Sequence, residues 1–204
     1  MSVYAYLSFA AAMFFLVLSP GPGLAAVLSR TLAFGKAAGF RTVAGMVPVD
    51  FLFLGLAMAG LSAVATLMGP FFMIVKYTAA AYLIWLGIKA WRNAGAPVEM
   101  AEQDGRGRWK DFGIGALVTL GNPKAIIFYS ALLPTFFDVA HMDVTAFVIT
   151  SVIITVSLFT VYGGYILLAD RSRRLLGQAA RKRQMDRGIG AMLMGSGVLV
   201  ATRS

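Results

Sequence analysis

The sequence contains no cysteine and only one histidine among its 204 residues. The lack of cysteine excludes disulfide bonds and metal sites built on thiolates. Charge is also scarce, since 13% of the residues are charged and 59% are hydrophobic. An average soluble domain has about 25% charged residues. These shortages exclude an ordinary soluble domain and predict a membrane protein.

Residue patterns typical of enzymes and metal proteins are also missing. The sequence shows no Ser/His/Asp arrangement and no pair of acids within one apolar segment. The glycines at Gly21 and Gly23 cannot form a phosphate-binding P-loop, because no Lys-Ser or Lys-Thr follows them. Asp138, His141 and Asp143 have a spacing that matches no specific metal site, and we expect them in a solvated loop. We therefore predict no catalytic residue, no metal and no cofactor.

Long uncharged stretches recur at the length that a membrane requires. Residues 1–29, 51–75 and 144–169 carry no charge, and a helix needs about 20 apolar residues to cross the hydrocarbon core. The pattern predicts an all-α integral membrane protein that forms one membrane domain over residues 1–204. We place its six transmembrane helices near residues 3–28, 41–62, 71–90, 112–134, 144–168 and 188–202.

The positive charges lie in alternate connections between these spans. Most of the 18 Lys and Arg residues fall in three segments: 30–41, 89–110 and 171–187. The other two connections, 63–70 and 135–143, contain none. The positive-inside rule therefore places the three basic segments in the cytoplasm and predicts that both termini are periplasmic. This arrangement explains the net charge of +9 without nucleic acid as a partner.

The basic segment 171–187 has two interpretations. It fits an interfacial helix that binds anionic membrane lipids, but the favoured interpretation is a cytoplasmic loop that only fixes the topology. The segment 93–111 is linker-like, because its first part mixes Gly, Pro and charged residues without apolar periodicity. It divides the chain into two three-helix halves, 1–92 and 112–204. Three is an odd number, so related halves would form a 3+3 inverted repeat, as in many transporters.

Two of the predicted spans are broken by proline at matching places in the two halves. The first contains Pro20, Gly21, Pro22 and Gly23, and the fourth contains Asn122, Pro123 and Lys124. Each proline lacks an N–H, so the carbonyls of Leu16, Leu18 and Thr119 lose their helical donors. Unpaired backbone at membrane depth has to face protein or a water-filled cavity.

Such breaks create groups that bind ions. A half-helix N-terminus attracts anions and freed carbonyls attract cations, so the two breaks suit a zwitterionic amino acid. Paired breaks of this kind are a pointer to a transporter's binding site. The alternative is a pair of kinks that only shape helix packing.

Charged residues inside the spans are few and deserve a functional hypothesis. Asp50 is placed to accept a substrate ammonium or to take up a proton that couples transport to the proton gradient. Lys124 is placed to bind a substrate carboxylate or to pair with Asp50. An Asp50–Lys124 ion pair that only fixes helix packing is the alternative for both residues. Lys76 lies near a span end, where its ammonium can reach the interface.

A set of sequence blocks occurs in order along nearly the whole chain: Ser19-Pro20-Gly21-Pro22-Gly23, Ser29-Arg30, Gly35, Gly39, Gly45, Ala80-Ala81-Tyr82-Leu83-Ile84-Trp85-Leu86-Gly87-Ile88-Lys89, Gly121-Asn122-Pro123-Lys124-Ala125, Phe128, Pro134, Asp186-Arg187-Gly188 and Gly195. Together these blocks resemble the LysE/RhtB family of amino-acid exporters. The resemblance implies a bacterial inner-membrane carrier that exports amino acids or close derivatives and is driven by the proton-motive force. The matching blocks belong to the shared scaffold, so they assign no particular amino acid.

The sequence therefore predicts a secondary transporter that exports amino acids by proton antiport and alternating access. Its substrate would lie between the Pro20–Pro22 break and the Asn122–Pro123 break, with Asp50 coupling transport to protons. Two alternatives come from other classes: a small membrane enzyme acting on lipid-linked substrates, and a non-transporting scaffold or channel. Small residues in several spans also allow a homodimer face.

Overall fold

The computed structural model describes residues 2–59 and 105–175, together with separate positions between 77 and 94 and between 187 and 201. Within these residues every regular element is helical, which confirms the predicted all-α class. The elements are α1 (Val3–Leu18), α2 (Pro22–Phe34), α3 (Lys36–Met58), α5 (Gly105–Leu120), α6 (Pro123–Ile127), the π-helix η1 (Phe128–Leu132), α7 (Leu133–Phe136), the 3₁₀ helix η2 (Val139–His141) and α8 (Val144–Leu175).

The predicted helix breaks in the first and fourth spans are confirmed. The helices α1 and α2 meet at an angle of 57°, and the helices on either side of Asn122 meet at 53°. Among the described residues, α3 and α8 are each long and apolar enough to cross a membrane, and each bent pair adds one candidate span. The predicted spans 71–90 and 188–202, and with them Lys76, lie largely outside the described residues. The six-span 3+3 repeat therefore stays a prediction.

Several helix ends differ from the sequence-based expectation. The first span continues to Phe34 rather than ending at residue 28, and α3 begins at Lys36 rather than at residue 41. The helix α5 begins at Gly105, inside the predicted linker 93–111, and α8 continues to Leu175 rather than ending at residue 168. Arg30 of α2 and Asp111 of α5 lie just beyond two of the predicted span ends, and they form a buried ion pair with each other.

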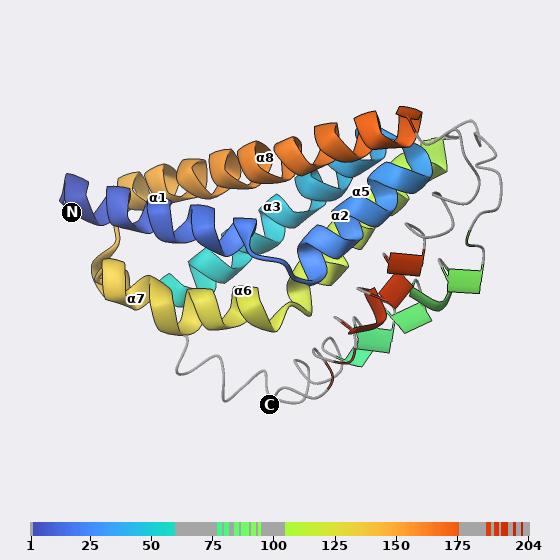
Figure 1. The fold of residues 1–204 in the computed structure, drawn as a ribbon. Helices are drawn as coiled ribbons and strands as arrows, with labels where there is room; N and C mark the ends of the chain where they lie inside the picture. The colour runs from blue at the N-terminus through green and yellow to red at the C-terminus, as the bar shows by residue number, and fades with distance from the viewer. Residues whose placement is uncertain are drawn as a thin grey trace.

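The central helix of the described bundle is α3. It packs against α2, α5 and α8, while α8 runs along both α1 and α2 (Figure 1). Large side chains from several elements fill the core between them, including Phe9 of α1, Leu54 of α3, Tyr129 of η1 and Ile154 of α8. A second cluster joins α2 and α5 to Ala80 and Leu193. The breaks in both bent pairs therefore face the same protein interior.

The helices α3 and α5 are in backbone contact at two glycines. A Cβ atom added at Gly45 would lie 1.9 Å from the carbonyl oxygen of Phe112. One added at Gly115 would lie 1.9 Å from the carbonyl oxygen of Thr42. No side chain fits at either position unless the helices separate, so glycine is required there by close approach.

We predict that Gly45→Ala destabilises the protein by about 1–3 kcal/mol or more, because overpacking forces the backbones apart. Gly113→Ala on α5 is the matched control, since an added Cβ meets nothing within 4 Å there. At an exposed helix position alanine is more stable than glycine by about 1 kcal/mol, so the control variant should have unchanged or higher stability. Thermal unfolding in detergent measures both variants. Equal melting temperatures for the two would contradict the packing described.

A buried charge cluster connects α2, α3 and α5. Asp111 of α5 is 0% exposed. One carboxylate oxygen accepts from Arg30 Nε at 2.7 Å and also from Arg30 Nη2. The other oxygen accepts from Arg41 Nε at 3.0 Å. The Arg30 guanidinium also lies 4.0 Å from the centre of the Phe34 ring. We call these residues, Arg30, Arg41 and Asp111, the arginine–aspartate cluster.

Candidate functional site

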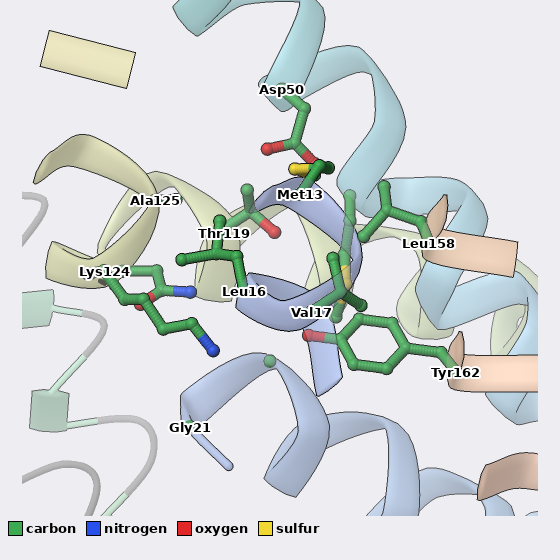
Figure 2. Close-up of a pocket in the computed structure, with 13 residues that line it drawn as sticks. Met13, Leu16, Val17, Gly21, Asp50, Thr119, Lys124, Ala125, Leu158 and Tyr162 are labelled. Carbon is green, nitrogen blue, oxygen red and sulfur yellow. Dashed lines mark hydrogen bonds between the residues drawn. The ribbon is translucent and has the colours of Figure 1, made fainter. Parts of the chain in front are cut away.

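The two helix breaks touch each other. Lys124, at the start of α6, donates from its Nζ to the carbonyl of Ser19 at 2.8 Å and to the Ser19 hydroxyl at 2.7 Å. A cavity of about 40 Å³ opens beside this contact (Figure 2). Its lining comes from both breaks and from α1, α3, α5 and α8: Met13, Leu16, Val17, Gly21, Gly23, Met46, Asp50, Thr119, Asn122, Lys124, Ala125, Leu158 and Tyr162.

Asp50 lies at one end of this cavity. Its side chain comes from the middle of α3 and is 4% exposed, and Figure 2 shows the carboxylate directed toward Met13 and Thr119. Within the described part of the chain it makes no ion pair. The Tyr129 hydroxyl lies close to it, yet that hydroxyl makes no hydrogen bond of normal geometry. A buried carboxyl without a cation is costly, so it has to bind a cation or a proton.

Lys124 marks the other end of the cavity, beside the α1–α2 break. Its Nζ would lie 3.8 Å from a Cβ at Gly21, and its hydrogen bonds go to Ser19. The structure does not contain the Asp50–Lys124 ion pair that the sequence left open as the structural alternative. The Lys124 ammonium donates instead to the carbonyl and hydroxyl of Ser19. The two opposite charges therefore remain separate, at different parts of one cavity (Figure 2).

The two half-helix N-termini are not equivalent. Gly21 caps α2 without any side-chain acceptor, and Pro22 occupies the first turn. The first-turn N–H groups of this 13-residue helix are therefore not capped by a side chain, and Gly21 and Gly23 both line the cavity. At α6, by contrast, the Asn122 side chain accepts from the Lys124 N–H at 3.1 Å. The predicted attraction for anions therefore belongs to the α2 end.

The sequence predicts that the carbonyls that lose a helical donor to proline stay free to bind cations. In the structure each of these carbonyls accepts another hydrogen bond. The pairs are Ser19 Oγ to Leu16 O at 3.1 Å, Tyr165 Oη to Leu18 O at 3.2 Å and Asn122 N to Thr119 O at 3.1 Å. These bonds satisfy the backbone groups that the breaks would otherwise leave unpaired at membrane depth. Asp50 is the one acidic side chain among the described residues that line the cavity.

Sequence reasoning missed the uncharged hydroxyls of the site. Thr119 and Tyr162 line the cavity, and the Tyr162 hydroxyl would lie 2.9 Å from a Cβ at Gly23. Thr119 lies just before the Gly121-Asn122-Pro123 break, so its position in the sequence could have predicted that it lines the cavity. Tyr162 sits in the long apolar helix α8 and carries no such signal. Its place follows from helix packing alone.

Asp138, His141 and Asp143 form no cluster that could hold a metal ion, nor do other described residues. Asp143 caps α8, because its Oδ1 accepts from the Ala146 N–H at 2.7 Å. His141 Nδ1 lies 2.9 Å from Asp138 Oδ2 in an exposed pair. These contacts account for all three residues as loop and helix-capping groups.

Comparisons with known proteins agree on one family. The family model described as LysE type translocator matches residues 14–204. The chain is 34% identical to a membrane protein of Synechocystis over 97% of its length and 96% of that protein. It is 31% identical to the homoserine/homoserine lactone efflux protein of Salmonella typhimurium, covering 92% of this chain and 91% of the relative.

A third relative is the leucine efflux protein of Klebsiella pneumoniae. The two are 30% identical, over 80% of this chain and 78% of the relative. No solved structure matches the chain significantly. The family match covers both helix breaks and every cavity residue except Met13. The chain therefore belongs to the LysE type translocator family, and it is a membrane transporter rather than an enzyme.

Proposed function

We propose that this protein exports amino acids or close derivatives across the bacterial inner membrane. The family match and the relatives named as homoserine and leucine efflux proteins support this class of cargo. The single observation that carries the proposal is the cavity between the two helix breaks, with an acid at one end and a lysine at the other.

The substrate lies in this cavity with its charges matched to the two ends. The ammonium meets the Asp50 carboxylate, which is buried and has no ion-pair partner among the described residues. The carboxylate meets Lys124 and the N-terminus of α2, where Gly21 supplies no capping side chain. A positive side chain and a helix N-terminus both attract an anion, so they act together.

Transport proceeds by alternating access, because the described cavity is too small for the cargo. A volume of about 40 Å³ holds a few water molecules, each needing about 10–15 Å³ by the same measure. The helices must therefore separate for loading. The cluster of Arg30, Arg41 and Asp111 lies roughly 10–14 Å along α2, α3 and α5 from the cavity residues Gly23, Asp50 and Thr119, at 1.5 Å per residue.

By the positive-inside rule, we expect that cluster on the cytoplasmic side and both termini in the periplasm. Loading from the cytoplasm then requires the cluster to open. Proton antiport follows from the chemistry of Asp50, because a proton and a substrate ammonium compete for one carboxylate. A proton that enters from outside releases the ammonium, and a new substrate displaces the proton toward the cytoplasm. The six-span repeat, the lipid contacts of 171–187 and a homodimer remain further predictions.

Counterflow in proteoliposomes tests the proposed function. Purified protein is reconstituted with unlabelled leucine or homoserine inside, and uptake of the labelled amino acid is followed with and without a proton gradient. We expect exchange in both conditions and net movement against the concentration gradient only when the proton gradient drives it. Downhill flux that ignores the proton gradient would indicate a channel, and no flux of any amino acid would contradict the proposal.

We predict that Lys124→Met raises the half-saturating substrate concentration of counterflow by about tenfold or more, the equivalent of losing one charge-assisted hydrogen bond. The expected change is in apparent affinity, because Lys124 contacts the substrate carboxylate. Lys124→Arg is the control, since it keeps the charge. The Arg variant should stay closer to the wild type than the Met variant. Unchanged half-saturation in Lys124→Met would remove Lys124 from the binding site.

A further inference from the structure

We propose that the cavity selects amino acids whose side chains are uncharged and rejects basic and acidic ones. This inference rests on the proposed function, because it assumes that amino acids bind between the helix breaks. It is carried by the charges and the wall chemistry of the cavity.

The cavity holds only two charged side chains among its described lining residues, one of each sign: Asp50 and Lys124. Both are needed for the substrate backbone, the first for the ammonium and the second for the carboxylate. The charges of the site and of a zwitterion then cancel. A lysine or glutamate side chain would add one charge for which the described lining residues offer no partner.

The other described lining residues carry no charge that could pair with such a side chain. Met13 and Val17 of α1 and Leu158 of α8 form an apolar surface, and all three are buried. The uncharged polar groups are Thr119 and Tyr162, whose hydroxyls lie between the apolar wall and the helix breaks (Figure 2). Such a surface accepts methyl and methylene groups, and its hydroxyls can hydrogen-bond a small hydroxyl group.

The expected discrimination is large. An uncompensated charge in a buried site costs several kcal/mol, so we expect transport of lysine and glutamate to be about 100-fold lower than transport of uncharged amino acids. Discrimination within the uncharged group depends on apolar contacts and is about 10- to 200-fold per methylene, so lysine and glutamate are compared with the best uncharged substrate.

The first experiment is counterflow with a panel of labelled leucine, threonine, homoserine, lysine and glutamate. Transport of at least one uncharged amino acid, with lysine and glutamate about 100-fold lower, supports the inference. Lysine or glutamate transport within tenfold of the best uncharged substrate overturns the inference, while the proposed amino-acid export still stands. If none of the five is transported, the proposed function itself fails.

The second experiment adds a charge to the wall. Thr119→Asp introduces a carboxylate at a cavity-lining position and preserves approximate side-chain size, and Thr119→Asn is the uncharged control. We expect the ratio of lysine to leucine transport to rise about tenfold or more in the Asp variant, because the new carboxylate pairs with the side-chain ammonium of the bound lysine. The Asn variant should leave the ratio near that of the wild type.

A second position provides the same test if the Thr119→Asp variant does not fold. Leu158→Glu places the acid on α8, on the opposite wall of the cavity, with Leu158→Gln as its control. Whichever Asp or Glu variant reconstitutes should raise the lysine-to-leucine ratio above that of its amide control. Equal ratios in folded acid and amide variants at both positions would overturn the proposal that charge balance in this cavity sets the substrate class.

Discussion

Replacing Asp50 with asparagine is expected to abolish proton-driven export and to lower counterflow by about 100-fold or more, the equivalent of leaving a substrate ammonium without its charged partner. Asparagine keeps the size of the side chain but can neither bind a proton reversibly nor carry a negative charge. Both readouts should fall, because the same carboxyl meets the ammonium and the proton. Uptake into proteoliposomes with and without a proton gradient measures them.

Two controls separate the role of Asp50 from a general loss of folding. Asp138→Asn changes an exposed loop acid, whose side chain is 70% exposed, and should transport like the wild type. Asp50→Glu keeps the charge and should recover part of the proton response. If Asp50→Asn retained counterflow but lost the proton response, Asp50 would serve coupling alone. A full proton response in Asp50→Asn would contradict both of its proposed roles.

Replacing Asp111 with alanine is expected to destabilise the protein by about 3–5 kcal/mol, because two arginines lose their buried counter-charge. Asp111 accepts hydrogen bonds from Arg30 and Arg41 on its two oxygens and is fully buried. Removing it leaves the Arg30 guanidinium uncompensated at the contact of α2 with α5. Thermal unfolding in detergent measures the loss.

The matched control for Asp111 is its neighbour on the same helix. Lys110 is exposed, so Lys110→Ala should change stability by less than about 0.5 kcal/mol. The double variant Asp111→Ala with Arg30→Met should recover part of the lost stability, since it removes the largest uncompensated charge together with its partner. Equal melting temperatures for Asp111→Ala and Lys110→Ala would show that the cluster does not hold these helices together.

The positions of the helix breaks were predictable because their cause is local. A proline removes its own N–H and the bond to the carbonyl four residues earlier wherever it stands in a helix. The breaks after Leu18 and Leu120 therefore coincide with Pro20, Pro22 and Pro123, whereas Pro48 lies within the continuous helix α3. The presence of Asp50 in the cavity was also predictable, because a charge in the middle of a span rarely faces lipid.

The partners of these groups were not predictable, because they depend on packing between distant segments. Lys124 bonds to Ser19, 105 residues earlier in the chain, rather than to Asp50. Arg30 pairs with Asp111, 81 residues away. A sequence pattern identifies a charge as costly but cannot identify the residue that compensates for it.

The most direct test of the substrate site uses the absence of cysteine from the chain. A single cysteine at Leu16, which lines the cavity and is partly exposed, can be labelled with a membrane-permeant maleimide. Asp138→Cys in the exposed loop is the control. We predict that the transported amino acid slows labelling of Leu16→Cys, with half-protection at the concentration that half-saturates counterflow, and leaves Asp138→Cys unaffected. Labelling of Leu16→Cys that proceeds at the same rate under saturating substrate would contradict the claim that the substrate binds between the two helix breaks.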